Sequence, residues 1–240
     1  MTSRTKEQRS LQPSRTTLFT ISRREYEMVC GLSDVQLKQA YQLRAAIFCR
    51  ELGWVGQADQ SHETDEFDHF VHHLGIESEN KMASYLRIHP AGSPWMVDRI
   101  FKHVVPPSAG LHNAGTCEVS RLAVAREFRG NAEFEGHSMF CRAMQLMFAF
   151  CQLNDIHTIF TIVSAPILRL LQDHGLPFKA ADSLYLPTDR NTPVFAILSW
   201  PEFLCSEDPL ITRHRPAYLE TEKNAYQSIR RRKEYIFDLV

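Results

Sequence analysis

Segments with the hydrophobic spacing of β-strands alternate along this chain with segments that have the spacing of α-helices. Strands are recognised by runs of β-branched and aromatic residues, and helices by apolar residues at every third or fourth position. A helix is expected behind the N-cap pair Ser33-Asp34, and a strongly apolar helix spans 138–153. The other expected elements are strands at 17–21, 70–76, 82–88, 117–124, 158–163 and 194–199, and helices near 95–103 and at 166–174. This order predicts an α/β domain with one mixed sheet and helices on its faces.

The length of 240 residues favours one large domain over two small ones, since domains average ~150 residues. A domain of this size buries roughly 70% of the surface of its unfolded chain, so it needs no disulfide bonds to fold. Residues 1–17 are polar and basic, which predicts a disordered arm. The folded domain is expected to span 18–204, followed by a partly helical C-terminal extension at 205–240.

The balance of charge excludes one class of partner. Lysines and arginines number 27 against 28 acidic residues, a formal net charge of −1, which argues against a dedicated nucleic-acid binder. No apolar stretch approaches the ~20 residues of a membrane span, and no signal peptide is expected at the N-terminus. The six cysteines form no CxxC pair, which is typical of free buried thiols and predicts a cytoplasmic protein. The oligomeric state is left open.

The densest charged feature is an acidic run with carboxylates at Glu63, Asp65, Glu66 and Asp68. Such runs usually lie in solvent, but this one contains Phe67 and precedes a predicted core strand. Carboxylates placed against a sheet need cationic partners, because burial otherwise protonates or excludes them. Arginines embedded in apolar segments are available at Arg44, Arg87 and Arg121. We therefore expect a buried network of arginines and carboxylates that lines a cleft.

The expected strand at 117–124 contributes residues of both charges. Alternation along a strand places Glu118 and Ser120 on one face and Val119 and Arg121 on the other.

Metal binding is not expected. Four histidines stand close together in the sequence, but only His69 and His73 have the i,i+4 spacing, and both fall near a predicted strand rather than a helix. The sequence also contains no nucleophile elbow, no phosphate-binding Walker loop and no dinucleotide fingerprint.

Many of the residues named above stand at a recognisable spacing: Arg44-x3-Phe48-x5-Trp54, Glu63-x-Asp65-x2-Asp68, Arg87, Phe101 and Glu118-x2-Arg121. This ordered set resembles the signature of the acyl-homoserine-lactone synthases, the autoinducer synthases of bacterial quorum sensing. The resemblance covers roughly residues 18–200. It implies a GNAT-like, three-layer α-β-α domain whose mixed, twisted sheet is split by a V-shaped cleft.

The resemblance also implies an acyltransferase reaction. The family joins the amine of S-adenosylmethionine to an acyl group delivered as a thioester, on acyl carrier protein or coenzyme A. Lactonisation then releases methylthioadenosine and the acyl-homoserine lactone. S-adenosylmethionine is a substrate in this reaction, so no cofactor is expected.

The resemblance assigns roles to particular side chains. S-adenosylmethionine carries a sulfonium, an ammonium and an adenine, so its site needs carboxylates and an aromatic face. The residues assigned to this substrate are Arg44, Phe48, Trp54, Asp65, Asp68, Arg87 and Phe101. The attacking amine must lose a proton, and either Glu63 or Glu118 is the expected base. Backbone N–H groups near Ser120 and Arg121 are expected to stabilise the oxyanion.

An acyl chain needs an apolar tunnel, and the residues assigned to it are Thr161, Met144, Met147, Phe148, Ile162 and Leu168. Family members with threonine at the position of Thr161 often favour 3-oxo chains, so the resemblance implies that preference here. A basic run at 230–233 would steer an acidic carrier protein if it lies beside the cleft.

Two alternatives stay open at this point. A GNAT-class N-acyltransferase that acts on another amine would keep the cleft without needing the acidic set and Trp54. A non-catalytic homologue that binds an acyl carrier would gain little from buried ion pairs, which cost desolvation energy. The acyl-chain length, the identity of the donor and the role of both terminal segments are not determined by the sequence.

Overall fold

The computed structural model describes residues 17–56, 59–104, 111–130, 133–181 and 192–237, with side chains described as far as Arg231. All but the last residue of the predicted arm at 1–17 therefore lies outside the described residues.

A mixed sheet forms the centre of the described chain, with strands in the order β1-β2-β3-β4-β5-β8-β10-β9. The strands are β1 (Thr20–Ser22), β2 (Glu27–Cys30), β3 (His72–Ser78), β4 (Lys81–Pro90), β5 (Thr116–Val124), β8 (Thr158–Ser164), β9 (Lys179–Ala180) and β10 (Pro193–Ser199). Neighbours in this sheet run antiparallel except β5 and β8, which are parallel. A separate hairpin, β6 (Glu133–Phe134) and β7 (His137–Ser138), precedes the long apolar helix.

The helices predicted behind Ser33 and at 138–153 and 166–174 lie close to their expected positions, the helix near 95–103 is shorter than expected, and the helix at 200–205 was not predicted. They are α1 (Asp34–Arg44), α2 (Met96–Arg99), α3 (Met139–Leu153), α4 (Ala165–Asp173), α5 (Trp200–Cys205) and α6 (Pro209–Phe237). Ser33 is the N-cap of α1, as the sequence predicts, and the structure shows that it forms a capping box with Gln36. The chain then continues from α1 into a π-helical turn at Ala45–Glu51. The predicted first strand lies later than expected, and β2 was missed because this short run gains its stability from pairing with both β1 and β3.

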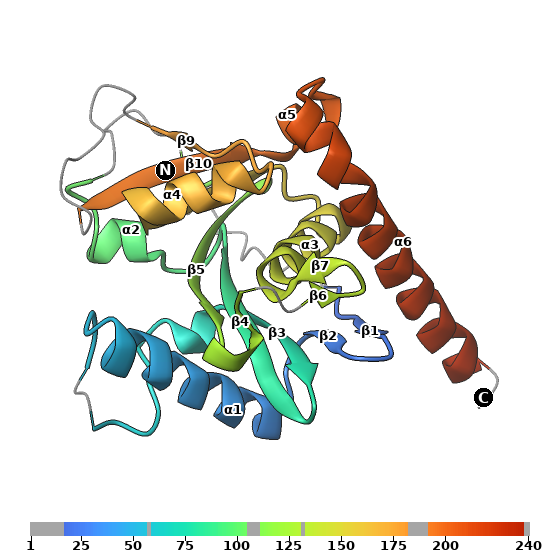
Figure 1. Ribbon diagram of the computed structural model, residues 1–240, viewed down its shortest axis with the longest axis horizontal. Helices are drawn as coiled ribbons and strands as arrows, with labels where there is room; N and C mark the ends of the chain where they lie inside the picture. The colour runs from blue at the N-terminus through green and yellow to red at the C-terminus, as the bar shows by residue number, and fades with distance from the viewer. Residues whose placement is uncertain (1–16, 57–58, 105–110, 131–132, 182–191, 238–240) are drawn as a thin grey trace, which may run out of the picture.

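The two faces of the sheet have different helices packed against them. On one face, Tyr85 of β4 contacts Arg44 of α1, whose guanidinium lies 5.7 Å from the ring centroid. On the opposite face, His72 of β3 packs against Phe150 of α3, with ring centroids 5.3 Å apart. Figure 1 shows α3 between the sheet and α6, with α1 on the other side of β4 and β5. The predicted three-layer α-β-α arrangement is confirmed.

The sheet divides between its two parallel strands. β5 and β8 pair from Thr116–Thr158 to Val119–Thr161, yet each strand continues beyond its last pair. At the last paired residues, the Thr161 hydroxyl donates a hydrogen bond to the Val119 carbonyl oxygen at 2.9 Å. The strands part beyond this contact, and we call the space the β5–β8 gap. This separation of two parallel strands is the arrangement that the V-shaped cleft implied by the family resemblance requires.

Helix α3 is apolar on nearly all sides because it is covered on nearly all sides. Its inner face packs on the sheet, and its outer face packs on α5 and α6. Phe148 shows this outer contact, with its ring centroid 4.9 Å from Trp200, 5.8 Å from Phe203 and 5.7 Å from Tyr218. The structure thus places Phe148, which the sequence analysis assigned to the acyl-chain tunnel, in the contact between α3, α5 and α6.

The C-terminal extension is largely the single helix α6. Glu220 at its middle lies 3.8 Å from Arg23 in the turn between β1 and β2, at the sheet edge remote from β8. The helix then continues away from α2 and α4 (Figure 1). The run at 230–233 does not lie beside the cleft, so the condition for its predicted role in steering a carrier protein is not met. Within the described residues, every helix is too short or too polar to cross a bilayer.

Replacing Phe148 by alanine tests the placement of this side chain. We expect the Phe148→Ala variant to lose about 3–5 kcal/mol of unfolding free energy, measured by urea denaturation, because it leaves a cavity among buried rings. The control Leu170→Ala, at a surface position of α4, should change stability little. A stable Phe148→Ala protein with an altered preference for acyl-chain length would contradict the placement.

Candidate active site

Three arginines and three carboxylates meet beside the end of α1 and strands β4 and β5. We call this group the charged cluster; its members are Arg44, Arg87, Arg121, Glu63, Asp65 and Asp68. Arg87 holds Asp65 by two parallel hydrogen bonds, with Nη1–Oδ1 and Nη2–Oδ2 distances of 2.7 and 2.8 Å. Asp68 Oδ1 accepts hydrogen bonds from Arg44 and Arg87 at 2.6 and 2.7 Å. The structure thus contains the buried network that the sequence predicts.

The loop that carries the three carboxylates is held by its own short-range contacts. Asp68 Oδ2 accepts a hydrogen bond from the Asp65 N–H at 2.8 Å, and Asp65 Oδ1 accepts one from the Phe67 N–H at 3.0 Å. Phe67 is buried, and the Arg87 guanidinium lies 5.9 Å from the centroid of its ring. The one apolar residue in the acidic run therefore anchors the loop against the arginines.

A β-bulge turns Arg121 toward the charged cluster. The register of β5 on β4 shifts between Ser120 and Ala123, which leaves an extra residue in β5. Arg121 has a φ of 55°, a left-handed conformation that costs a non-glycine residue roughly 1–2 kcal/mol. Two ion pairs, each at 3.0 Å, offset this cost. Arg121 thus shares the face of Ser120, and the expectation that it shares the face of Val119 was wrong.

The arginines keep the carboxyls of the charged cluster ionised. Burial alone raises the pKa of Asp65, but the hydrogen bonds and charge of Arg87, together with the charge of Arg121, lower it to about 2. The pKa values of Glu63 and Asp68 are also held below their ordinary range, because arginine contacts outweigh burial. Three positive and three negative side chains therefore balance at neutral pH.

Glu118 stands in a different environment on the same face of β5. It is fully buried, and its Oε2 accepts a hydrogen bond from the Met96 N–H at 2.6 Å, at the start of α2. Among the described residues, no arginine or lysine lies within ion-pair distance of it. Burial raises the pKa of Glu118 to about 8, whereas the pKa of Glu63 is lowered. Of the two predicted bases, Glu118 is the one whose pKa lies near neutral pH, where a general base is most effective.

Two buried residues that the sequence analysis missed, His89 and Met96, also lie beside Arg87. The Ser120 hydroxyl lies 2.7 Å from Arg87 Nε and 2.9 Å from His89 Nε2. Met96 Sδ lies 3.2 Å from Arg87 Nη2. The available signal was the position of His89, two residues after Arg87 and hence on the same face of β4.

The aromatic residues assigned to S-adenosylmethionine are only partly brought together. Phe48 is buried, and the Arg121 guanidinium lies 5.4 Å from the centroid of its ring. Trp54 lies beyond Phe48, with ring centroids 6.3 Å apart, and is 52% exposed at the edge of the site. Phe101 follows α2, where its N–H donates to the Met96 carbonyl oxygen. Among the described contacts, none joins the Phe101 ring to the charged cluster.

The family model for autoinducer synthases matches residues 29–192 of this chain. The chain belongs to the autoinducer synthase family. The acyl-homoserine-lactone synthase of Pantoea stewartii subsp. stewartii is 30% identical over 174 residues, which are 70% of this chain and 77% of that protein. The corresponding synthase of Aeromonas hydrophila is 25% identical over 142 residues, which are 59% of this chain and 69% of that protein.

Solved structures of family members show the same fold. The AHL synthase LasI matches with a TM-score of 0.61 at 19% identity, over 73% of this chain and 90% of that one. BjaI, a CoA-dependent acyl-homoserine lactone synthase solved with SAM and isopentyl-CoA, matches with a TM-score of 0.57 at 23% identity, over 77% of this chain and 82% of that one. The resemblance drawn from the sequence is confirmed, and with it the GNAT-like fold and the acyltransferase activity of an acyl-homoserine-lactone synthase.

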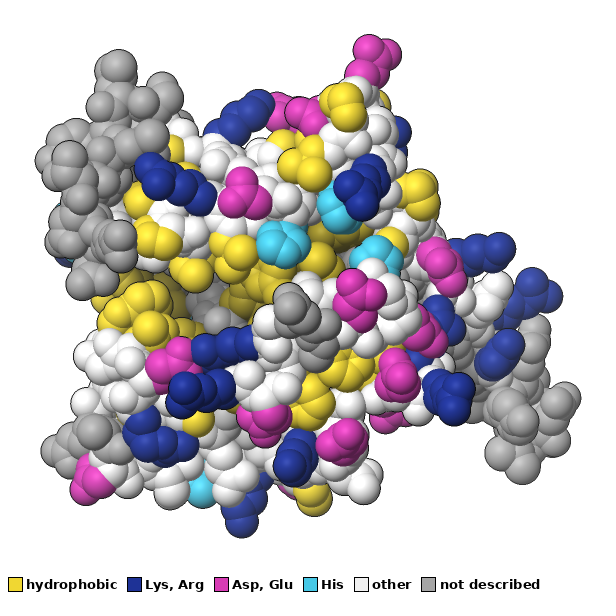
Figure 2. All heavy atoms as spheres, viewed as in Figure 1, with side chains coloured by type: hydrophobic (Ala, Val, Ile, Leu, Met, Phe, Trp, Pro, Cys, Tyr) yellow, Lys and Arg dark blue, Asp and Glu magenta, His cyan; other side chains and the backbone are white. Residues whose placement is uncertain are grey.

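The residues assigned to the acyl chain lie in several places in this family member. Thr161 marks the apex of the β5–β8 gap, and Leu168 of α4 is buried in the main core. Met144 and Met147 are buried in the core contacts of α3. Ile162 alternates to the other face of β8, where it packs near Phe160, Phe195 and Trp95. Figure 2 shows hydrophobic side chains gathered in a hollow beside α4.

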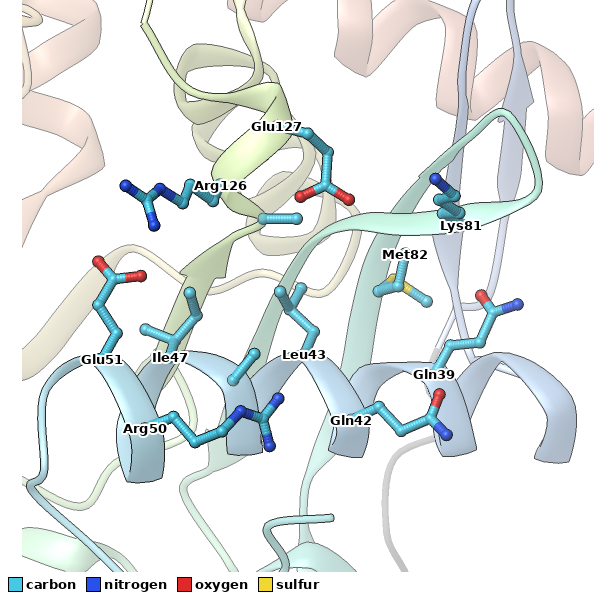
Figure 3. A pocket seen from close by; sticks show the side chains of 12 residues that line it. Gln39, Gln42, Leu43, Ile47, Arg50, Glu51, Lys81, Met82, Arg126 and Glu127 are labelled. Atoms are coloured by element: carbon cyan, nitrogen blue, oxygen red, sulfur yellow. The ribbon is translucent and has the colours of Figure 1, made fainter. Parts of the chain in front are cut away.

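A second hollow lies outside the charged cluster. This surface groove of about 640 Å³ runs between α1 and the ends of β4 and β5 (Figure 3). Leu43, Ile47 and Met82 lie inside it, and basic, acidic and amide side chains surround them. No member of the charged cluster lines the groove. In the described part of the chain, no three histidine, cysteine, aspartate or glutamate side chains are arranged to hold a metal ion.

The low pKa of Asp65 predicts a loss of stability in acid. A carboxyl whose pKa falls from about 4 to about 2 on folding stabilises the protein above pH 4, and this contribution of about 2 kcal/mol disappears as the pH falls toward 2. Urea denaturation of Asp65→Asn should therefore show lower stability at pH 7 and a flatter acid dependence than the wild type. Asp173→Asn, at an exposed position, is the matched control. Equal acid dependence in Asp65→Asn and the wild type would contradict the ion-pair assignment.

Proposed function

We propose that the charged cluster binds S-adenosylmethionine, that Glu118 accepts the proton of its amine, and that the acyl thioester enters through the β5–β8 gap. The observation that carries this proposal is the arrangement along β5. This one strand borders the gap and also contributes Glu118 and Arg121 to the charged face. An amine held at the cluster would therefore stand next to both the base and the acyl donor.

The charged cluster has polar groups available for a substrate. Arg44 is fully buried, and its Nη2 has no hydrogen-bond partner among the described residues; Asp65 Oδ2 lies 3.8 Å away from it. A buried unused donor is costly, and a substrate carboxylate would satisfy it. Asp65 is the most exposed carboxylate of the cluster and would face the positive groups of the substrate. Phe48 and Trp54 would supply the aromatic surface.

The reaction proceeds in two steps. First, Glu118 takes one proton from the substrate ammonium, and the free amine attacks the thioester carbonyl carbon. A C–N bond forms, the C–S bond breaks, and the leaving thiolate takes the second proton lost by the nitrogen, so that a thiol departs. The β5 edge that faces the gap is unpaired beyond Val119, so its N–H groups are available to the oxyanion. Second, a substrate carboxylate oxygen displaces methylthioadenosine from the γ-carbon and closes the lactone. S-adenosylmethionine is consumed as a substrate, and these steps call for no cofactor.

The preference for 3-oxo chains stays a prediction. The single O–H of Thr161 already donates to the Val119 carbonyl oxygen. To recognise a 3-oxo group, this hydroxyl would have to give up the Val119 carbonyl oxygen and donate to the 3-oxo oxygen instead. A panel of thioesters, on carrier protein and on coenzyme A, tests this preference and the identity of the donor together.

Product analysis tests the proposed function directly. The protein incubated with S-adenosylmethionine and acyl thioesters should release acyl-homoserine lactone and methylthioadenosine, identified by mass spectrometry. Asp65→Asn should reduce turnover at least ~100-fold, because it removes a charge that binds Arg87 and Arg121 in a buried site. Glu66→Asn, at the exposed neighbour in the same run, is the control and should leave turnover unchanged. Acylation of a different amine, or binding without turnover, would support one of the two alternatives.

The raised pKa of Glu118 predicts the pH dependence of the free enzyme. The base form of Glu118 predominates only above its pKa of about 8, so kcat/KM should rise with pH and level off beyond 8. Because the substrate amine titrates in the same range, the carboxyl is identified by carbon-13 NMR of the free protein. One glutamate signal should titrate near pH 8 and be missing in Glu118→Gln, whose kcat should fall about 10²–10⁴-fold. Near wild-type turnover in a folded Glu118→Gln protein would exclude Glu118 as the base.

A further inference from the structure

His89 is a fully buried histidine beside Arg87 that the proposed mechanism does not use. Its Nδ1 lies 3.1 Å from the Pro94 carbonyl oxygen, and its Nε2 lies 2.9 Å from the Ser120 hydroxyl. A carbonyl oxygen only accepts hydrogen bonds, so Nδ1 carries the proton. Burial and the charge of Arg87 lower the pKa of His89 to about 4, so the ring is neutral and Nε2 is an acceptor.

This tautomer fixes the direction of a chain of hydrogen bonds. His89 Nε2 accepts from the Ser120 O–H, which leaves the lone pairs of Ser120 Oγ free to accept from Arg87 Nε–H at 2.7 Å. The other four N–H groups of Arg87 face Asp65, Asp68 and Met96 Sδ. The Ser120 contact is therefore the one that holds the Nε edge of the guanidinium, opposite the edge that binds the carboxylates.

The Nδ1 side of the same imidazole contacts the segment that lies beside Glu118. Pro94 stands two residues before Met96, whose N–H donates to Glu118. One buried ring thus contacts both the support of Arg87 and the segment that carries the donor to Glu118. Its own packing is fixed by Phe67, with ring centroids 5.7 Å apart in an edge-to-face arrangement.

We propose that His89 is a positioning residue that, through Ser120, fixes the Arg87 guanidinium against the carboxylates and, through Pro94, fixes the start of α2 beside Glu118. Its expected effect on the affinity for S-adenosylmethionine rests on the proposed function. The assigned tautomer and the coupling between His89 and Ser120 do not.

The tautomer is tested by long-range proton–nitrogen NMR of the histidine rings at pH 7. The His89 signals, assigned by their absence from His89→Leu, should show a neutral ring with the proton on Nδ1. A proton on Nε2 would overturn the proposed chain of hydrogen bonds, because Ser120 could then no longer donate to the ring.

The coupling is tested by a double-mutant cycle read by calorimetric binding of S-adenosylmethionine. His89→Leu and Ser120→Ala should each weaken binding about tenfold, and the double variant should also weaken it about tenfold, because the two act through one chain of bonds. His89→Gln, which can keep an acceptor for Ser120, should stay closer to the wild type than His89→Leu. An effect of about 100-fold in the double variant, or no effect of Ser120→Ala, would overturn the proposal.

Ser120→Ala removes a single oxygen, so this arm remains informative if His89→Leu does not fold. The same cycle read in the free energy of unfolding needs no substrate and should show the same coupling. Coupling in unfolding, together with a wild type that makes no lactone, would refute the proposed function and support the positioning role. Lactone formation by the wild type, together with independent effects of the His89 and Ser120 substitutions, would support the proposed function and refute the positioning role.

Discussion

The buried pairing of arginines with carboxylates is the interaction on which the rest of this site depends. Arg44 and Arg87 are fully buried, and a buried guanidinium is tolerated only where its N–H groups have charged or polar partners. The partners come from segments far apart in the sequence: the end of α1, the acidic loop, β4 and β5. Meeting this electrostatic requirement joins these segments in one arrangement. Removal of one carboxylate would leave a buried charge without compensation.

Strand β5 brings together the features on which the proposed mechanism depends. Its pairing with β8 ends at Val119, which opens the gap, and its bulge a few residues later turns Arg121 toward the cluster. Glu118 lies just before both features, buried and away from the arginines. The carboxyl groups therefore have two kinds of environment. Arginines hold the pKa values of the carboxyls in the charged cluster low, whereas burial raises the pKa of Glu118.

The sequence predicted what local spacing and charge can specify. The N-cap at Ser33, the apolar helix α3 and the encounter of Arg44 with the acidic run all follow from residue type and order. Long-range packing decided the rest. Alternation cannot reveal the bulge at Arg121, which depends on the register of β5 against β4. Phe148 appeared suited to an acyl pocket because nothing in its own helix shows that α5 and α6 cover it.

On the proposed function, the charge balance of the site gives the substrate a part in activating its own base. The charged cluster is neutral as a whole, and Glu118 is mostly protonated below its pKa of about 8. S-adenosylmethionine would bring two positive groups and one carboxylate, and the carboxylate is matched by Arg44. The remaining positive charge favours the ionised form of a nearby carboxyl, so binding would lower the pKa of Glu118. The base would then be largely neutral in the empty, buried site, where a charge is costly, and ionised once the amine that it must deprotonate has arrived.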